Sequence, residues 1–399
     1  MTKPLGLVLA SALTFIFIGL APLLQPPWLL SCLLILFSLV LFLIRDTRYV
    51  SFSIIVLAAL YGIGWLSMFV FTCTLGIVVI GELAFRLTGG EPASYIYHLV
   101  AAIAVSLVVM LYLGCNAPLV VVIGVVVAVL LRAVLRGRDD ALMIEALGVA
   151  MTMLLFEELN FEVDLTLLVA AAIIAFGFGY TSYRLRVADI SGLFSGAMIG
   201  IILIVFADVR WFLIMLTFFI IGAGATRYRY GDKKRLGVAQ EHGGVRGYFN
   251  VFANGLVATG AAVLYGVTGG HPAFVALFMG SVASAAADTT ASEIGVTGKT
   301  PYLITTLQPV PRGTNGGVTL LGEVAAVIAA AIVAVTGWLV GVADPWMVVV
   351  TIIAGFIGTN VDSLVGATLE NSGRIGNSGT NLVATFVGGI SGTVLYLMG

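Results

Sequence analysis

The chain has 399 residues, 60% of them hydrophobic and only 10% charged, and its formal net charge at pH 7 is −1. About a quarter of the residues in a soluble globular domain are charged, so the composition excludes that class and indicates a protein that crosses a membrane many times. No polar stretch is long enough to fold as a soluble domain, and nucleic acid is therefore not an expected partner. The expected fold class is all-α, a polytopic transmembrane helical bundle.

Apolar runs that can span a bilayer, about 20 residues each, recur along the whole chain. The stretch from 50 to 86 is too long for one span, and only Gly62 and Gly64 punctuate it. Three or more further runs follow residue 248. The predicted spans before that point are 5–23, 28–44, 50–67, 69–85, 95–114, 117–134, 141–156, 165–183, 190–206 and 211–226.

Alternating these runs across a bilayer gathers the basic residues on one side. Of the 19 Lys and Arg residues, only Arg210 falls on the opposite side. Loops rich in Lys and Arg stay in the cytoplasm. We therefore expect a multi-pass protein of the cell membrane whose basic side, with any site on it, faces the cytoplasm.

The distribution of polar residues divides the chain into two predicted parts. Up to about residue 160 the loops are short, and the spans are rich in Val, Leu and Ile with isolated charges. Glu82 and Glu145 fit a functional and a structural role equally well, since Glu82 can pair with Arg86 one helical turn later. His98 is expected to be a satisfied histidine at a helix interface. We predict an N-terminal transmembrane extension over 1–160 and a transmembrane core over 165–399.

A basic segment from Arg227 to Gly247 interrupts the core. Its lysines and Arg235 are expected to act as topology determinants that also meet anionic headgroups. Arg246 differs, because Arg246, Asn250 and Asn254 follow one another at steps of four residues and would share one stripe of a helix. A polar stripe that faces lipid is costly, so this stripe must face protein or a wet cavity.

The stretch from 280 to 320 holds the parts that a metal and phosphate site needs. Asp288 and Glu293 lie near the predicted end of a helix of small residues. Arg312 directly precedes the turn Gly313-Thr314-Asn315-Gly316-Gly317. Hard metal ions prefer carboxylate oxygens, and phosphate binds to backbone N–H groups and to cations. A plain polar loop between two spans is the alternative.

Asp288, Glu293 and Asp362 are the candidate metal ligands. Asp288 and Glu293 are five residues apart and do not share a helical face. They can serve one metal cluster only if the helix ends or bends near Thr290.

The tripeptide Gly-Thr-Asn occurs three times, at 313–315, 358–360 and 379–381. Each copy precedes an apolar or small-residue stretch, so we expect three helix N-termini whose caps and free N–H groups converge on one anion. The run from 356 to 371 contains Asn360, Asp362 and Ser363. It is expected to be a broken or half helix that lines a cavity at the cytoplasmic edge.

Several blocks occur in an order that resembles the integral-membrane family that includes phytyl-phosphate kinase. The blocks are Arg246…Asn254-Gly255, Ala287-Asp288-Thr289-Thr290-Ala291-Ser292-Glu293, Arg312-Gly313-Thr314-Asn315-Gly316-Gly317, Asp362-Ser363-Leu364-Val365-Gly366 and Asn377…Asn381. The resemblance covers about residues 165–399. It implies transfer of a phosphoryl group from CTP to a prenyl monophosphate with Mg²⁺, and it extends to CTP-using dolichol kinases and lipid cytidylyltransferases.

The motifs and the resemblance together assign roles to individual residues. Asp288 and Arg312 are the expected catalytic residues, and Mg²⁺ is expected on Asp288, Glu293 and Asp362. Contacts to nucleotide and phosphate are expected from Arg246, Asn254, Lys299, Gly313, Thr314, Asn315, Gly316, Gly317, Asn360, Asn377 and Asn381.

Phosphoryl transfer needs little from a protein beyond positioning, a metal and positive charge, in keeping with motifs that contain no evident nucleophile. A prenyl phosphate is already ionised and needs no general base, which favours a monophosphate over a prenol as the acceptor. Three alternatives stay open: a cytidylyltransferase that attacks the α-phosphate of CTP, a prenol kinase, and a transporter built on broken helices. The sequence assigns neither a prenyl chain length nor an oligomeric state.

Overall fold

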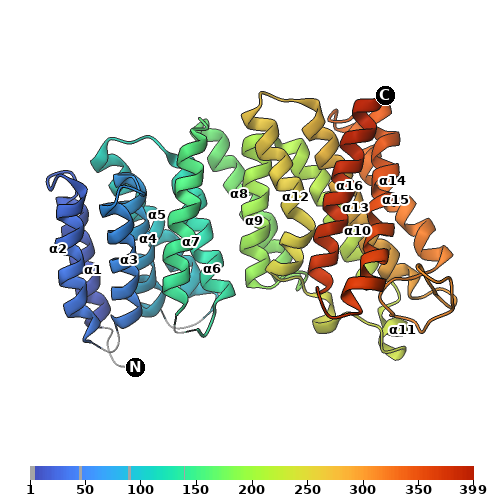
Figure 1. The fold of residues 1–399 in the computed structure, drawn as a ribbon, viewed down its shortest axis with the longest axis horizontal. Coiled ribbons are helices and arrows are strands. Elements are labelled where there is room, and N and C mark those ends of the chain that lie inside the picture. The colour runs from blue at the N-terminus through green and yellow to red at the C-terminus, as the bar shows by residue number, and fades with distance from the viewer. Residues whose placement is uncertain (1–4, 45–46, 89–90, 139) are drawn as a thin grey trace. The chain divides into compact units, whose positions relative to one another are not determined.

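A computed structural model describes residues 5–44, 47–88, 91–138 and 140–399 (Figure 1). Apart from one pair of two-residue strands, the regular structure of these residues is helical. Nine of the described helices are long and apolar enough to cross a membrane, and five shorter ones are apolar as well. The prediction of an all-α multi-pass membrane protein is confirmed.

The helices form two compact units, Met1–Leu168 and Val169–Gly399. The break between α3 and α4 falls at residues 63–67, so the predicted division of the stretch from 50 to 86 is confirmed. The helices of the first unit are α1 (Leu5–Leu20), α2 (Pro27–Phe42), α3 (Arg48–Gly62), α4 (Met68–Leu87), α5 (Ala93–Leu113), α6 (Pro118–Val134) and α7 (Ala141–Leu159).

Charged side chains lie buried in the first unit. Glu82 receives a hydrogen bond from Arg86 at 2.5 Å and another from Arg132 at 3.1 Å, which confirms its structural pairing at the end of α4. His98 is fully buried 3.7 Å from Glu145, and its ring nitrogens make no hydrogen bond with the described residues. The expectation of a satisfied histidine was therefore wrong, because the Glu145 carboxylate lies beyond hydrogen-bonding distance of the ring.

The second unit begins within α8 and contains the remaining elements. Its helices are α8 (Leu165–Arg184), α9 (Ile190–Phe206), α10 (Val209–Arg227), α11 (Tyr230–Arg235), α12 (Tyr248–Val267), α13 (Pro272–Gly295), α14 (Leu320–Leu339), α15 (Pro345–Val365) and α16 (Asn377–Met398). The shorter elements are a 3₁₀ turn, η2 (Glu241–Gly244), a π-helical turn, η3 (Gly366–Glu370), and the antiparallel strands β1 (Tyr302–Leu303) and β2 (Gly317–Val318).

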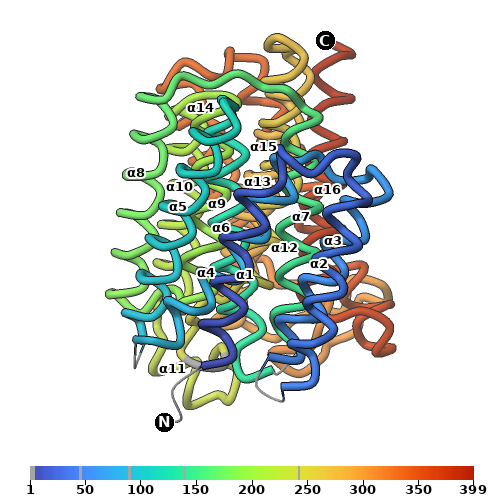
Figure 2. The backbone as a smooth tube through the Cα atoms, turned by 90° about the vertical axis from the view of Figure 1, so that its left-hand side faces the viewer, coloured from blue at the N-terminus to red at the C-terminus, as the bar shows by residue number. Residues whose placement is uncertain are grey.

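Helix α13 is the centre of the second unit and packs against α10, α12, α14, α15 and α16 (Figure 2). Its middle consists of small residues, which let neighbouring backbones come close. A Cβ atom on Gly280 would stand 2.5 Å from the carbonyl oxygen of Gly388 in α16, and one on Gly355 of α15 would stand 3.1 Å from Ala283. This close packing fixes the end of α13 that carries Asp288 and Glu293.

The structure answers two points about helix breaks that the sequence raised. Helix α13 runs without interruption past Thr290 to Gly295, so the helix end that would let Asp288 and Glu293 serve one metal cluster is not found there. Helix α15 likewise continues through Asn360 and Asp362 and ends in η3, so the second Gly-Thr-Asn copy lies inside a helix. The Asn360 amide donates to the Phe356 carbonyl at 3.0 Å and to Glu323 of α14 at 3.2 Å, so the neighbouring helix accommodates this polar residue.

Candidate functional site

A cavity of about 270 Å³ lies at the end of the second unit where α13 and α15 finish and α14 and α16 begin. In Figure 1, α11 marks this end of the unit and the C-terminus marks the opposite end. The cavity wall includes Asp288, Glu293, Arg312, Asp362 and the whole turn from Gly313 to Gly317. The structure therefore brings together motif residues from distant parts of the sequence, from Asp288 to Asn377.

The side-chain carboxyl groups of Asp288 and Asp362 meet across this cavity within hydrogen-bonding distance. Thr380, in the first turn of α16, is a further hydrogen-bonding neighbour of Asp362. One oxygen of Asp362, Oδ1, is buried and makes no hydrogen bond with the described residues. Two ionised carboxylates in contact repel each other, so this pair requires a shared proton or a cation.

Two positions of the turn from Gly313 to Gly317 have a backbone conformation that favours glycine. Gly313 has φ +82° and Gly316 has φ +77°, both in the left-handed region. A Cβ atom on Gly316 would stand 2.5 Å from the Cβ of Ala367 and 2.6 Å from the carbonyl oxygen of Ser363. The turn therefore lies directly against the end of α15 and η3, and it lines the same cavity as the carboxyl pair.

Three backbone donors of this turn are free. The N–H groups of Gly313, Asn315 and Gly316 make no hydrogen bond with the described part of the chain. Arg312, at the entrance to the turn, donates from Nη2 to the carbonyl oxygen of Gly298 at 2.8 Å, and its side chain is exposed. Free backbone N–H groups beside a guanidinium are the donors that an anion such as phosphate binds to.

Glu293 lines the same cavity but has a partner of its own. Its carboxylate forms a buried ion pair with Lys233, which also donates to the carbonyl oxygens of Ala225 at 3.1 Å and Thr226 at 2.7 Å. Lys233 is 1% exposed, so the expectation that it acts as a topology determinant facing headgroups was wrong. A lysine is buried this deeply only when its charge is compensated, and Glu293 provides the compensation.

Two acidic residues of the cavity escaped the sequence analysis. Glu323, in the first turn of α14, and Glu370, in η3, both line the wall. The sign that points to them is a carboxylate next to a predicted span, which is a functional hint by default. Among the described lining residues, five are therefore acidic and Arg312 is the only basic one.

The remaining predicted phosphate contacts are placed unevenly. Asn377 lines the cavity, and Asn360 reaches it only through its hydrogen bond to Glu323. Lys299 is exposed and does not line the wall. Asn254 and Asn381 are buried outside the wall, each with a side-chain oxygen that makes no hydrogen bond among the described residues.

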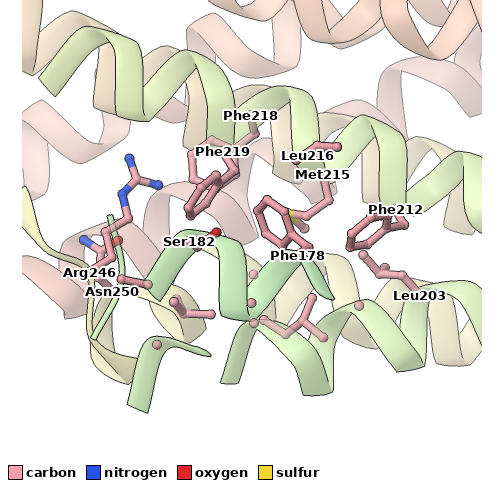
Figure 3. A pocket seen from close by; sticks show the side chains of 18 residues that line it. Phe178, Ser182, Leu203, Phe212, Met215, Leu216, Phe218, Phe219, Arg246 and Asn250 are labelled. Atoms are coloured by element: carbon pink, nitrogen blue, oxygen red, sulfur yellow. The ribbon is translucent and has the colours of Figure 1, made fainter. Parts of the chain in front are cut away.

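Arg246 lies apart from the cavity wall. It precedes α12 rather than belonging to it, so the predicted helical stripe with Asn254 was wrong. Its backbone N–H donates to Val187 at 2.9 Å and its carbonyl accepts from Asp189 at 3.1 Å, which ties it to the connection between α8 and α9. The side chain stands with Asn250 at one end of a separate apolar groove, shown in Figure 3.

The Arg246 guanidinium is buried without a carboxylate in contact. It is 7% exposed and forms no hydrogen bond or ion pair with the described residues, and its carbon Cζ lies 5.4 Å from the ring centroids of Phe218 and Phe219. Cation–π contacts contribute about 0.5–2 kcal/mol each, whereas burying an ion costs several kcal/mol. Burial lowers the pKa of Arg246 to about 10, so the group stays charged at neutral pH.

The residues of the cavity fit a magnesium ion that arrives with phosphate. Mg²⁺ is usually held by one or two carboxylates, with phosphate oxygens and water in its other positions. The paired carboxyl groups of Asp288 and Asp362 and the buried free oxygen of Asp362 meet that requirement. Among the described residues, no group of three or more His, Cys, Asp or Glu is arranged to hold a metal ion by itself.

Comparison with known proteins locates the chain among membrane proteins. The family model described as "Integral membrane protein DUF92" matches residues 173–389, which lie within the second unit. An uncharacterized membrane protein of Methanocaldococcus jannaschii is 34% identical over 212 residues, 53% of this chain and 87% of the relative. An uncharacterized membrane protein of Synechocystis is 38% identical over 196 residues, 48% of this chain and 76% of the relative.

A plant protein is also similar. The chloroplastic protein VTE6 of Arabidopsis thaliana is 34% identical over 165 residues, 40% of this chain and 50% of the relative. No solved structure matches the chain significantly.

Proposed function

The chain belongs to the family of integral membrane proteins designated DUF92, and from this premise we propose that it is a kinase that transfers a phosphoryl group from CTP to a prenyl monophosphate. The observation that carries the proposal is the juxtaposition of the Asp288–Asp362 carboxyl pair with the free N–H groups of the Gly313–Gly317 turn. The order of these motifs, which resembles that of the phytyl-phosphate kinase family, supports the same class of reaction.

The charge of the cavity favours a nucleotide that arrives with a metal ion. Acidic side chains outnumber basic ones on the wall, so a bare triphosphate would be repelled. Asp288 and Asp362 would hold Mg²⁺, and the bound ion would supply positive charge to neutralise the phosphate oxygens. The N–H groups of Gly313, Asn315 and Gly316 donate to the phosphate chain, and Arg312 stabilises charge on the group that is transferred.

The proposed acceptor brings its own nucleophile. An oxygen of the prenyl monophosphate attacks the γ-phosphorus of CTP, a new P–O bond forms, and the bond to the β-phosphate oxygen breaks to release CDP. The acceptor oxygen is ionised at neutral pH, so no side chain has to remove a proton. The described cavity residues suit this reaction, because they supply donors and negative charge but no histidine.

We place the cavity on the cytoplasmic side of the membrane. Among the described Lys and Arg residues of the second unit, only Arg210 stands at the opposite end of the helices. The positive-inside rule then puts the cavity end in the cytoplasm, where CTP is available. In this orientation the same end would lie at the membrane edge, where the phosphate of a prenyl lipid would lie.

The proposal is tested with the purified full chain in detergent, CTP, Mg²⁺ and a panel of prenyl alcohols and prenyl monophosphates, with the products resolved by mass. The expected products are a prenyl diphosphate and CDP. Release of pyrophosphate with a CDP-linked lipid would identify a cytidylyltransferase instead. Phosphorylation of the alcohols alone would identify a prenol kinase.

A further inference from the structure

The apolar groove that contains Arg246 has two unlike ends. It lies between α8, α9, α10 and α12, and Figure 3 shows Arg246 and Asn250 at one end, with Phe212 and Leu203 at the other. The walls between these ends are aromatic and aliphatic, and we call this space the Arg246 groove. A ligand that matches it has an anionic head and an apolar chain.

The charged end of the groove requires an anion that the described residues do not supply. The α13 carboxylate that acts electrostatically on Arg246 is Glu293, and its charge is already compensated by Lys233. Arg246 thus carries a buried positive charge beyond what its neighbours neutralise. A phosphate monoester at this point would receive the charge-assisted hydrogen bonds that a guanidinium offers.

We infer that the Arg246 groove is the acceptor site, in which Arg246 binds the phosphate of an isoprenoid monophosphate and the apolar walls hold the first part of its chain. This inference rests on the proposed function for the identity of the ligand. The groove is small, about 60 Å³, so it holds only the part of the chain next to the phosphate, and the remainder of a long tail extends beyond it.

The Arg246 guanidinium also stands beside the helix that carries the carboxyl pair. Gly222 of α10 is in contact with both Arg246 and Thr289, since a Cβ atom on Gly222 would lie 2.4 Å from Arg246 Nη2 and 3.3 Å from the Thr289 side chain. Thr289 follows Asp288 in α13. A phosphate at Arg246 therefore lies next to α13, on the side of the unit where the nucleotide is proposed to bind.

A second apolar groove is the rival site for the lipid chain. It has a volume of about 420 Å³, lies between α10, α13 and α14, and is lined by Gly224, Thr290, Ile294, Ile328 and other apolar residues. It contains no charged side chain. The larger groove could hold a tail, but only the Arg246 groove explains how the phosphate would be recognised.

Two glycines allow a matched test of the grooves. Gly196 of α9 lines the Arg246 groove and Gly224 of α10 lines the rival one, and a Cβ atom on either would meet no atom within 4 Å. Leucine is a good helix former, so Gly196→Leu and Gly224→Leu each fill one groove without a backbone clash. Both variants are compared with wild type by thermal unfolding in detergent, to verify that they fold.

The experiment measures equilibrium binding of radiolabelled geranylgeranyl monophosphate to the full chain in detergent without nucleotide. Geranylgeraniol, inorganic phosphate and palmitate serve as competitors. We expect Gly196→Leu to weaken binding of the monophosphate at least tenfold and Gly224→Leu to leave it within twofold. We expect Arg246→Gln to weaken the monophosphate at least tenfold but geranylgeraniol less than threefold, with Arg246→Lys recovering part of the loss.

The results separate this inference from the proposed function, because no turnover is required. Loss of binding in Gly224→Leu with normal binding in Gly196→Leu would overturn the assignment of the groove. Equal losses of monophosphate and alcohol in Arg246→Gln would overturn the role of its charge, and equally tight binding of palmitate would overturn the selectivity for phosphate. Normal binding in the groove without any phosphoryl transfer would instead refute the kinase proposal alone.

Discussion

The carboxyl groups of Asp288 and Asp362 lie within hydrogen-bonding distance of each other although they belong to different helices of the second unit. Asp288 stands near the end of α13, and Asp362 stands in the last turn of α15 before η3. Burying two like charges side by side destabilises a protein unless a proton or a cation lies between them. The pair lines the same cavity as a turn with free N–H groups, and carboxylates together with such donors suit a metal-bound phosphate.

The carboxyl pair predicts a strict requirement for both aspartates. Asp288→Asn and Asp362→Asn should each lower the turnover number by about a hundredfold or more, because each removes a charge that holds Mg²⁺. Turnover is measured against Mg²⁺ concentration at saturating CTP. The matched control is Asp344→Asn, at the opposite end of α15, where the side chain caps the helix through Met347 and asparagine also caps well. Activity near wild type in both site variants would remove the metal assignment.

Arg312 is predicted to act on the transferring group rather than on nucleotide affinity. Arg312→Ala should lower turnover by about a thousandfold and weaken CTP binding much less, since the free N–H groups of the turn remain. Arg312→Lys should recover only part of the rate, because it keeps the charge but loses the planar pair of donors. Arg374→Ala, which removes an exposed basic residue outside the cavity wall, is the control.

Turnover and equilibrium CTP affinity are measured separately for the Arg312 variants. If affinity collapses while turnover at saturating CTP stays normal, Arg312 anchors the ground state and the catalytic role is wrong.

The buried Lys233–Glu293 pair predicts that substitutions of the two residues have non-additive effects on the free energy of unfolding. Lys233→Met and Glu293→Gln should each lower the free energy of unfolding by about 3–5 kcal/mol, because each leaves the partner's polar group buried without its countercharge. The double variant should regain most of that loss. Unfolding is followed by titration of the detergent-purified protein with SDS. Additive losses in the double variant would show that the two side chains do not stabilise each other.

The shape of the glycine turn predicts that alanine at Gly316 weakens CTP binding, whereas alanine at Gly373, a second glycine in the left-handed region, does not. Gly316→Ala and Gly373→Ala both place a side chain at positive φ, which costs about 1–2 kcal/mol. Only the first would also drive a methyl group against Ala367, whereas Gly373 has no atom within 4 Å of its Cβ position. CTP affinity should therefore fall at least about tenfold in Gly316→Ala and stay near wild type in Gly373→Ala. Equal affinities in the two variants would mean that the shape of the turn does not matter for the nucleotide.

Much of the fold is readable from the sequence because the membrane imposes a simple rule. A span needs a long apolar run, and each run is separated from the next by a few polar or glycine residues. The expected spans 117–134 and 190–206 correspond to α6 (Pro118–Val134) and α9 (Ile190–Phe206). The convergence of the motif blocks on one end of the bundle follows from the same alternation of helices.

Three of the misplaced features depend on contacts between distant residues. No local pattern reveals that Lys233 is buried, since its partner Glu293 is 60 positions away. Likewise, the second Gly-Thr-Asn copy reads as a helix start, but Asn360 can stay inside α15 because Glu323 of another helix accepts its amide. Arg246 reads as part of a helix, yet its backbone pairs with the segment before α9. Propensity and periodicity describe one element at a time, so tertiary hydrogen bonds decide such positions.

The most direct test of the central claim follows the phosphorus atoms of CTP. The purified full chain is incubated with Mg²⁺ and geranylgeranyl monophosphate, once with CTP labelled in the γ-phosphate and once with CTP labelled in the α-phosphate, and the lipid fraction is separated and counted. If the Asp288–Asp362 cavity performs phosphoryl transfer, the γ-label appears in the prenyl diphosphate and the α-label stays in CDP. In Asp288→Asn, neither labelled prenyl diphosphate nor labelled CDP is formed. Transfer of the α-label to the lipid, or γ-label transfer that is undiminished in Asp288→Asn, would contradict the account.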